Sequence, residues 1–257
     1  MRDNILELLI NPYSGNDLKK ENDFLVDVIT GEKFATKNSI PVVLREEEVT
    51  GLNRLYQKRY DWLVYFYDFM MLTLSPLVGG KEAFQSIAEI IEVKSDDRVL
   101  ETSVGTGIEI KNLVDHNMQA DYYGMDISYG MLKKCHLNSL KWNIDIKLVQ
   151  GNAENIPFKD EHFDVVFHIG GINFFNDKEK AIQEMIRVAR PGGMIYIGDE
   201  TVKQIEEQPK FISIFYQKPD PEIYDPPLKL IPQDMINVQN HLLWGEKLYL
   251  LSFQKPE

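Results

Sequence analysis

Three segments of the chain each end an apolar, strand-like run and open onto polar or glycine-rich residues. They are residues 99–107 (VLETSVGTG), 122–126 (YYGMD) and 150–158 (QGNAENIPF). In open α/β sheets, ligands bind outside the carboxyl ends of the strands. Three consecutive strand ends that carry binding chemistry therefore indicate a nucleotide-type pocket more strongly than any one of them alone.

The first two segments have the spacing of a nucleoside site. Gly105 and Gly107 permit a tight turn into a helix and a close approach of the backbone to a ligand. Asp126 follows Gly105 by 21 residues, close to the roughly 20-residue offset at which a carboxylate meets ribose hydroxyls. Both features have structural alternatives. Plain turns also use glycine, and Asp126 precedes Ser128 and a helical stretch, where Asp and Ser are favoured N-caps.

The third segment distinguishes between cofactors. Residues 152–158 (NAENIPF), followed by residues 160–164 (DEHFD), resemble the Asp-Ala-x-x-Leu-Pro-Phe-x-x-x-x-Phe-Asp signature of class I S-adenosylmethionine (SAM) methyltransferases. The resemblance is to the broad subfamily that contains the ubiquinone and menaquinone C-methyltransferases. Residues 190–193 (RPGG) match that family's turn into its fifth strand. The resemblance covers residues 96–200 and implies SAM as the cofactor.

The family pattern implies roles for the first strand ends. Glu101 is expected near the methionine amine, and Gly105 and Gly107 leave backbone room for the adenosyl and methionine parts. Asp126 is expected to hold the ribose, with Ile127 beside it at the cofactor.

Later segments complete the implied site. Asn152 is expected to face the adenine amino group, the Ala153 N–H a ring nitrogen, and His168 the methionine side. Two residues depart from the family. Ser103 replaces the first glycine, so the backbone there is expected to lie farther from the cofactor. Asn152 replaces an aspartate, and its amide oxygen can still accept a hydrogen bond, without charge.

Composition restricts the classes of binding partner and the cellular compartment that we expect for this protein. A net charge of −12 without a basic run argues against a nucleic-acid partner, because phosphate neutralisation supplies most such affinity. The single cysteine, Cys135, excludes an intrachain disulfide and suits a reducing cytoplasm; a small buried hydrophobe is the expected role. The opening residues 1–4 lead into no signal-peptide pattern, so we expect a cytoplasmic protein.

Residues 1–46 form a separate small, β-rich segment, with strands expected at 24–29 and 40–44. The segment resembles the zinc ribbon that precedes some methyltransferase domains. The four positions where that pattern has cysteines are here Asn11, Ser14, Asp27 and Thr30. Because no thiolate ligands remain for a tetrahedral zinc, we expect a metal-free segment held together by its apolar residues.

Residues 47–95 are expected to form a helical lid at the start of the main domain, which spans 47–257. The stretch 56–74 is apolar and aromatic nearly all round. It fits a buried helix packed on the sheet, or a cover over the acceptor lined by Tyr60 and Tyr67; the two readings can both hold. Asp68 and its length argue against a membrane span, which needs roughly 20 apolar residues.

From residue 96 onward, strand and helix patterns alternate, which predicts a Rossmann-like, doubly wound and mostly parallel sheet. Helix 177–189 illustrates the pattern, with apolar residues on one face and charges opposite. The family resemblance makes residues 248–253 an antiparallel strand at or near the sheet edge. The strands are expected at 98–102, 121–126, 145–150, 163–168 and 194–199, and the other helices at 107–115 and 129–140.

The sequence thus predicts a SAM-dependent methyltransferase that acts on a small apolar or aromatic acceptor. Phe174, after the fourth strand, joins the aromatic stretch in the expected acceptor pocket. No catalytic residue is assigned, because displacement at a sulfonium needs alignment more than a base. An RNA methyltransferase and a non-catalytic SAM-binding protein that works through a partner remain alternatives. A nicotinamide dehydrogenase shares the glycine loop and Asp126, but it leaves residues 152–164 unexplained.

Overall fold

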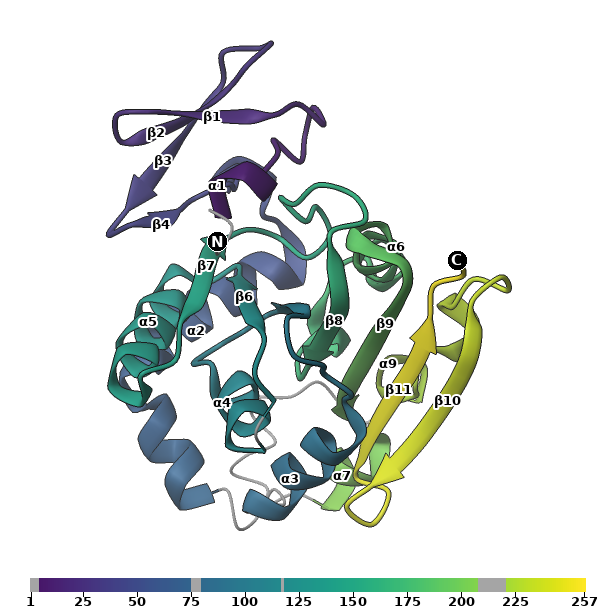
Figure 1. Cartoon of the computed structure of the whole chain (residues 1–257). Coiled ribbons are helices and arrows are strands. Elements are labelled where there is room, and N and C mark those ends of the chain that lie inside the picture. The colour runs from purple at the N-terminus through teal and green to yellow at the C-terminus, as the bar shows by residue number, and fades with distance from the viewer. Residues whose placement is uncertain (1–4, 75–79, 117, 208–220) are drawn as a thin grey trace.

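The computed structural model describes residues 5–74, 80–116, 118–207 and 221–257, without the side chains of Leu63 and residues 65–84. Two sheets organise these residues. A small antiparallel sheet lies at the N-terminus, and a seven-stranded sheet carries the remainder (Figure 1).

The N-terminal sheet has the strand order β1-β2-β3-β4 and antiparallel pairing throughout. Two of its strands were predicted, although both are shorter than the expected 24–29 and 40–44. The other two were missed because three of the four residues of β1 are charged and exposed, and β3 has one buried residue, Phe34, between an exposed lysine at each end. The elements here are α1 (Ile5–Leu8), β1 (Leu18–Glu21), β2 (Phe24–Asp27), β3 (Lys33–Lys37), β4 (Ile40–Pro41) and η1 (Glu46–Glu48).

The large sheet has the order β10-β11-β9-β8-β5-β6-β7, and its five central and distal strands from β9 to β7 are parallel. This confirms the predicted Rossmann-like sheet and its antiparallel C-terminal strand. That strand does not lie at the edge, because β10 pairs outside it. The strands are β5 (Arg98–Thr102), β6 (Asp121–Asp126), β7 (Ile146–Gln150), β8 (Phe163–Ile169), β9 (Ala189–Glu200), β10 (Ile236–Leu243) and β11 (Leu248–Gln254).

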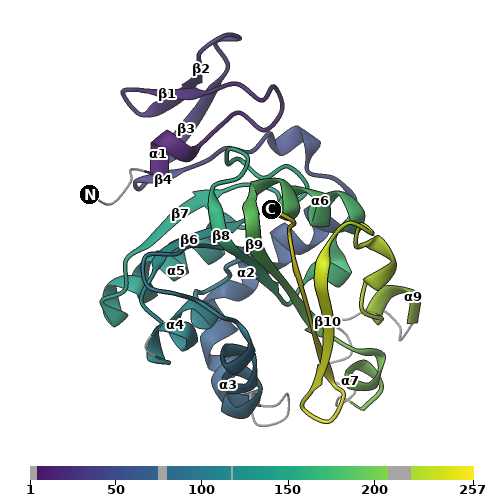
Figure 2. The ribbon, with the colours of Figure 1, turned by 45° about the vertical axis from the view of Figure 1, so that its right-hand side comes forward.

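Helices cover both faces of the large sheet (Figure 2). One face packs against α3, α4 and α5 through a core that includes Ile87, Ile110 and Leu132. The other face packs against α6 through Ile182 and Met185. Helix α2 packs along α5. The helical elements are α2 (Gly51–Leu74), α3 (Gly80–Ile90), α4 (Ile108–Asp115), α5 (Tyr129–Trp142), η3 (Ile172–Phe174), α6 (Lys178–Val188), α7 (Val202–Glu207), α9 (Pro221–Tyr224) and η4 (Leu228–Leu230).

The N-terminal segment is joined to the large domain by backbone hydrogen bonds. The Ile10 N–H donates to the Pro157 carbonyl at 3.1 Å, and the Lys159 N–H donates to Leu8 at 2.9 Å. The Val43 N–H donates to the carbonyl of Gln150, at the end of β7, at 2.9 Å. The N-terminal segment therefore contacts the loop that leaves β7.

Candidate functional site

Chain order reverses between β5 and β8, which lie side by side at the centre of the large sheet. In sheets of this kind, ligands bind in the crevice outside the carboxyl ends of the strands at this reversal. The glycine-rich loop follows β5 here. The sequence-predicted residues from β5, β6, β7 and β8 therefore gather at one edge of the sheet (Figure 1).

The loop after β5 adopts the left-handed backbone that its glycines permit. Gly105 has φ of 52° and Gly107 has φ of 82°. A Cβ at Gly107 would lie 2.8 Å from the Cys135 sulfur, so a side chain there would collide with α5. Ser103 also has a positive φ, of 80°. It thus holds the backbone conformation of the glycine that it replaces, anchored by an N–H bond of 2.8 Å to the Met125 carbonyl.

Asp126 fixes this loop against the next one. Its carboxylate accepts from the Gly105 N–H at 2.9 Å and from the Ser128 N–H at 2.8 Å. The N-cap of α5 is Ser128, whose side chain accepts from the Met131 N–H, and not Asp126. Burial raises the pKa of Asp126 to about 6, against the opposing effect of these hydrogen bonds. Each carboxylate oxygen keeps acceptor capacity for a ribose hydroxyl.

The loop after β7 carries Asn152 and Ala153, the residues predicted to face the adenine. The side-chain oxygen of Asn152 accepts from the Glu154 N–H at 3.0 Å, which folds the loop into a tight turn. Among the described residues, no acceptor is found for the Ala153 N–H. The Ile127 carbonyl accepts from the side chains of Gln57 at 3.2 Å and Gln150 at 2.9 Å, which ties the two loops together.

Glu101, on β5, is fully buried, and neither carboxylate oxygen has a hydrogen-bond partner among the described residues. Burial raises its pKa well above the usual range, with added repulsion from Glu109 and Asp126. A buried carboxylate without donors is costly. The donor set that would satisfy it is a cation with N–H groups, so Glu101 fits the charged methionine end of SAM.

His168, at the end of β8, is fully buried. Its Nδ1 lies 2.5 Å from the Thr102 carbonyl, so Nδ1 carries the proton and donates. Nε2 has no partner among the described residues. Burial lowers the pKa of His168, and the nearby Asp199 opposes this shift. The ring is therefore neutral, with an acceptor nitrogen, and it meets the Phe175 ring edge-on at 5.1 Å.

Two of the three expected acceptor-pocket residues lie in one aromatic group. Tyr56 stacks on Phe174 with ring centroids 4.2 Å apart, and Tyr60 lies 6.2 Å from Tyr56. Helix α2 thus brings its aromatic side chains to the loop after β8. Tyr67 lies on the same helix, but its side chain is outside those that the structure describes.

The four former cysteine positions of the N-terminal segment form a hydrogen-bonded cluster. The Asp27 carboxylate accepts from Asn11 at 2.8 Å, Ser14 at 2.6 Å, Asn16 at 3.0 Å and the Thr30 N–H at 2.8 Å. Among the described residues, no group of three His, Cys, Asp or Glu side chains suits a metal ion. A carboxylate and its donors therefore occupy the positions that the zinc-ribbon resemblance aligns with cysteines.

The sequence reasoning missed a row of contacts between α2 and the cofactor loops. Asn53 donates to Glu154 at 2.8 Å, Gln57 donates to the Ile127 carbonyl, and Asp61 accepts from the Ser128 hydroxyl at 2.6 Å. Polar residues at positions 53, 57 and 61 recur every four residues, which places them on one face of a helix. That spacing was a signal for a polar stripe on α2.

Comparisons with known proteins agree with this geometry. Residues 100–197 match a family described as a methyltransferase domain. A demethylmenaquinone methyltransferase of Desulfitobacterium hafniense is 33% identical over 141 residues, covering 54% of this chain and 53% of that protein. A phthiotriol/phenolphthiotriol dimycocerosates methyltransferase of Mycobacterium ulcerans is 35% identical over 105 residues, 41% of this chain and 38% of that protein. The chain thus spans about half, or less, of the length of these curated relatives.

A solved structure shares the fold. A SAM-dependent methyltransferase from Aquifex aeolicus superposes with a TM-score of 0.52 at 18% identity, covering 66% of this chain and 88% of that one. Residues 100–197 therefore match a methyltransferase domain, on a fold that this chain shares with a SAM-dependent methyltransferase, and SAM is the cofactor that this match implies. Within the described residues, none of the helices combines the length and apolar character that crossing a bilayer requires.

Proposed function

We propose that this protein transfers the methyl group of SAM to a small apolar or aromatic acceptor, a quinone-like ring being the best candidate. The observation that carries the proposal is the convergence of Glu101, Asp126 and the loop at residues 152–153 at the reversal of the sheet. Among the described residues, the Glu101 carboxyl is buried without hydrogen-bond donors. The Asp126 carboxylate keeps acceptor capacity for hydroxyls, and the Ala153 N–H remains as a donor for the edge of a base.

Bound SAM supplies an electrophilic methyl group. The sulfonium sulfur that carries this group is the leaving group and becomes a neutral thioether. The residues of this chain supply orientation and the exclusion of water, which are the main requirements of such a displacement. In this proposal, Asp126 and the glycine loop hold the nucleoside, and Glu101 holds the charged methionine end.

The aromatic group formed by Tyr56, Tyr60 and Phe174 supports a flat or apolar acceptor, because aromatic faces gain from stacking and from water exclusion. The names of the demethylmenaquinone relatives point the same way. The net charge of −12 disfavours RNA as the acceptor.

Calorimetry with SAM, its demethylated product and NADH tests the cofactor assignment. We expect SAM and the product to bind at about micromolar Kd and NADH to give no heat. Methyl transfer from labelled SAM to a demethylated quinone, with tRNA and rRNA as alternative acceptors, tests the acceptor class. Binding of NADH without SAM refutes the cofactor assignment, and labelling of RNA alone refutes the acceptor class.

A further inference from the structure

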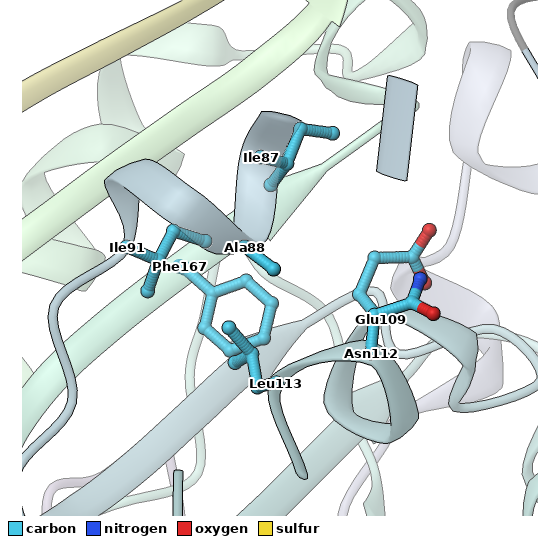
Figure 3. A pocket seen from close by; sticks show the side chains of 7 residues that line it. All are labelled: Ile87, Ala88, Ile91, Glu109, Asn112, Leu113 and Phe167. Carbon is cyan, nitrogen blue, oxygen red and sulfur yellow. The ribbon is translucent and has the colours of Figure 1, made fainter. Parts of the chain in front are cut away.

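Glu109 lies beside Glu101 at the start of α4 and borders a small pocket between α3, α4 and β8. Glu109 and Asn112 lie together on one side of this pocket, and apolar side chains, among them Phe167, line the other (Figure 3). The Glu109 carboxylate accepts a hydrogen bond from its own backbone N–H, and, among the described residues, the side-chain nitrogen of Asn112 is buried without a partner. The pocket therefore presents polar atoms whose hydrogen-bonding capacity is unused.

Among the described residues, the charged groups that act on Glu101 are carboxyls. Repulsion from Asp126, on β6, raises the pKa of Glu101. Burial raises the pKa of the Cys135 thiol on α5, and the carboxyls of Glu101, Asp126 and Glu109 add to this shift. The described residues that α3 turns to the pocket are apolar (Ile87, Ala88 and Ile91). Lys111, the nearest cation along α4, pairs with Asp115 instead.

Two neighbouring carboxyls with so few donors resist ionising together, since each charge is desolvated and repels the other. Burial raises the pKa of Glu109 to about 7 and that of Glu101 well above its usual range. The pair therefore holds at least one proton near neutral pH when no cation is present.

We infer that Glu101 and Glu109 form a joint site for the positively charged methionyl end of the cofactor, and that this cation displaces a proton from the pair as it binds. The inference rests on the proposed function. Its new elements are Glu109 as a cofactor-positioning residue and the coupling of SAM binding to proton release. The charge balances, because one proton leaves the pair as one cation enters it.

The direction of the pH dependence follows. A cation beside the pair lowers its pKa, so the liganded protein binds fewer protons than the free protein between the two pKa values. SAM affinity therefore rises with pH in this window, by up to about tenfold per pH unit for one proton released. The rise levels off above the pKa of the free pair, since no proton is then left to displace.

The test is calorimetric titration of the full chain with SAM between about pH 6 and about pH 8, in buffers of different ionisation enthalpy. Adenosine is the matched ligand, because it reaches Asp126 but lacks the methionyl charge. Glu109→Gln removes the second carboxyl. Glu161→Gln removes a carboxyl just before the first residue of β8 and is the control. Glu109→Asp keeps the carboxyl and replaces Glu109→Gln if that variant folds poorly.

We expect wild-type protein and Glu161→Gln to release close to one more proton with SAM than with adenosine. Glu109→Gln should bind SAM several-fold more weakly at the upper pH, and its rise in affinity should begin at a lower pH because repulsion no longer adds to burial in raising the pKa of Glu101, whereas Glu109→Asp should retain the wild-type profile. SAM binding with heats that do not depend on the buffer overturns this inference and leaves the proposed function intact. Failure of SAM to bind at any pH overturns both.

Discussion

At the scale of single residues, Asp126 has an observed structural role and a proposed binding role. Its two carboxylate oxygens accept from the Gly105 and Ser128 N–H groups, so the loops after β5 and β6 meet at this side chain. A ribose bound there would add hydroxyl donors to the same oxygens. Removing the side chain therefore affects both the loops and the ligand.

Asp126→Ala should weaken SAM binding by about 1.5–3 kcal/mol, the scale of hydrogen bonds to a charged group. Asp126→Asn keeps one acceptor oxygen and should lose less. Calorimetry, with circular dichroism to show that the variants are folded, measures both. Unchanged SAM affinity in a folded Asp126→Ala protein would assign the residue to loop structure alone.

Ser103 carries backbone strain that a glycine would avoid, because its φ of 80° is left-handed. The left-handed region costs a non-glycine residue roughly 1–2 kcal/mol. A glycine would remove this cost, but the larger entropy of its unfolded chain would offset about 0.5–1 kcal/mol of the gain. Ser103→Gly should therefore raise stability by up to about 1 kcal/mol and leave SAM affinity unchanged. Ser103→Val, with its branched Cβ, should lower the melting temperature. A less stable glycine variant would mean that the serine side chain contributes more than the strain costs.

The two residues that depart from the family pattern show what a sequence can predict at this scale. The type of residue 103 led us to expect a backbone set farther from the cofactor, and that distance stays a prediction; the structure shows that Ser103 has a left-handed φ of 80°. The hydrogen bond of its N–H to Met125 on the neighbouring strand enforces that conformation. A contact between strands is not visible in local sequence. The sequence reasoning missed Glu109 for a similar reason, because the residues that lie near it belong to other elements.

At the scale of elements, Glu154 connects three segments. One of its oxygens accepts from the Asn53 side chain on α2 at 2.8 Å and from the N–H groups of Asn176 and Asp177 at 2.9 and 3.1 Å. Asn176 and Asp177 lie just before α6, and Glu154 follows Ala153 in the loop after β7. The helix over the site, the adenine-side loop and the loop after β8 are thereby held by one carboxylate.

Glu154→Ala should raise the KM for SAM and lower stability by about 2–4 kcal/mol, because several buried donors lose a charged acceptor. Glu154→Gln retains an acceptor oxygen and should restore most of both. Glu179→Gln, an exposed position on α6, is the control. Equal losses in the Ala and Gln variants would show that the charge matters and that the geometry does not.

The aromatic side chains of α2 predict a separate effect on the acceptor. Tyr60→Ala should reduce methyl transfer to a ring acceptor by about 1 kcal/mol, roughly fivefold, as expected for a lost aromatic contact. SAM affinity should stay within a few-fold. Leu55, which is 54% exposed on the same helix, gives the control variant Leu55→Ala. A Tyr60→Ala protein with a lower melting temperature but normal turnover would place Tyr60 in the core only; Tyr67→Ala extends the test along α2.

Element prediction succeeded where burial imposes a periodic pattern and failed where it does not. The parallel strands β5 to β9 are buried on both faces, so their apolar runs are visible in the sequence. Strand β10 is almost wholly exposed, with polar residues at positions 237, 239, 240 and 241. Pairing with β11 forms it, and no feature of its own composition predicts that partner.

At the scale of the whole molecule, the N-terminal sheet carries a hydrogen-bonded cluster centred on Asp27. Burial opposes ionisation of this carboxyl, but hydrogen bonds from Ser14, the Thr30 and Ile29 N–H groups and Asn11 lower its pKa below the usual range. A depressed carboxyl pKa contributes stability above the unfolded value near about 4. That contribution is lost as the pH falls through the folded pKa.

The N-terminal sheet should therefore open in acid before the large domain does. Hydrogen exchange of residues 18–37, followed from neutral pH to below about pH 4, measures this. Asp27→Asn should expose the sheet at neutral pH already and remove most of its acid dependence. Asp23→Asn, an exposed neighbour, should behave as wild type. Simultaneous opening of both sheets in the wild-type protein would contradict the prediction.

The two borders of the large sheet are unequally protected. At one border the short strand β7 meets the N-terminal segment through Gln150. At the other, the eight residues of β10 expose Ile236, Val238 and Leu242 by 43–52%. An open strand edge with apolar side chains is a template for pairing with another chain. The aggregation hazard of this molecule is therefore one-sided, and a lysine placed at position 238 or 242 is the simplest way to keep concentrated samples in solution.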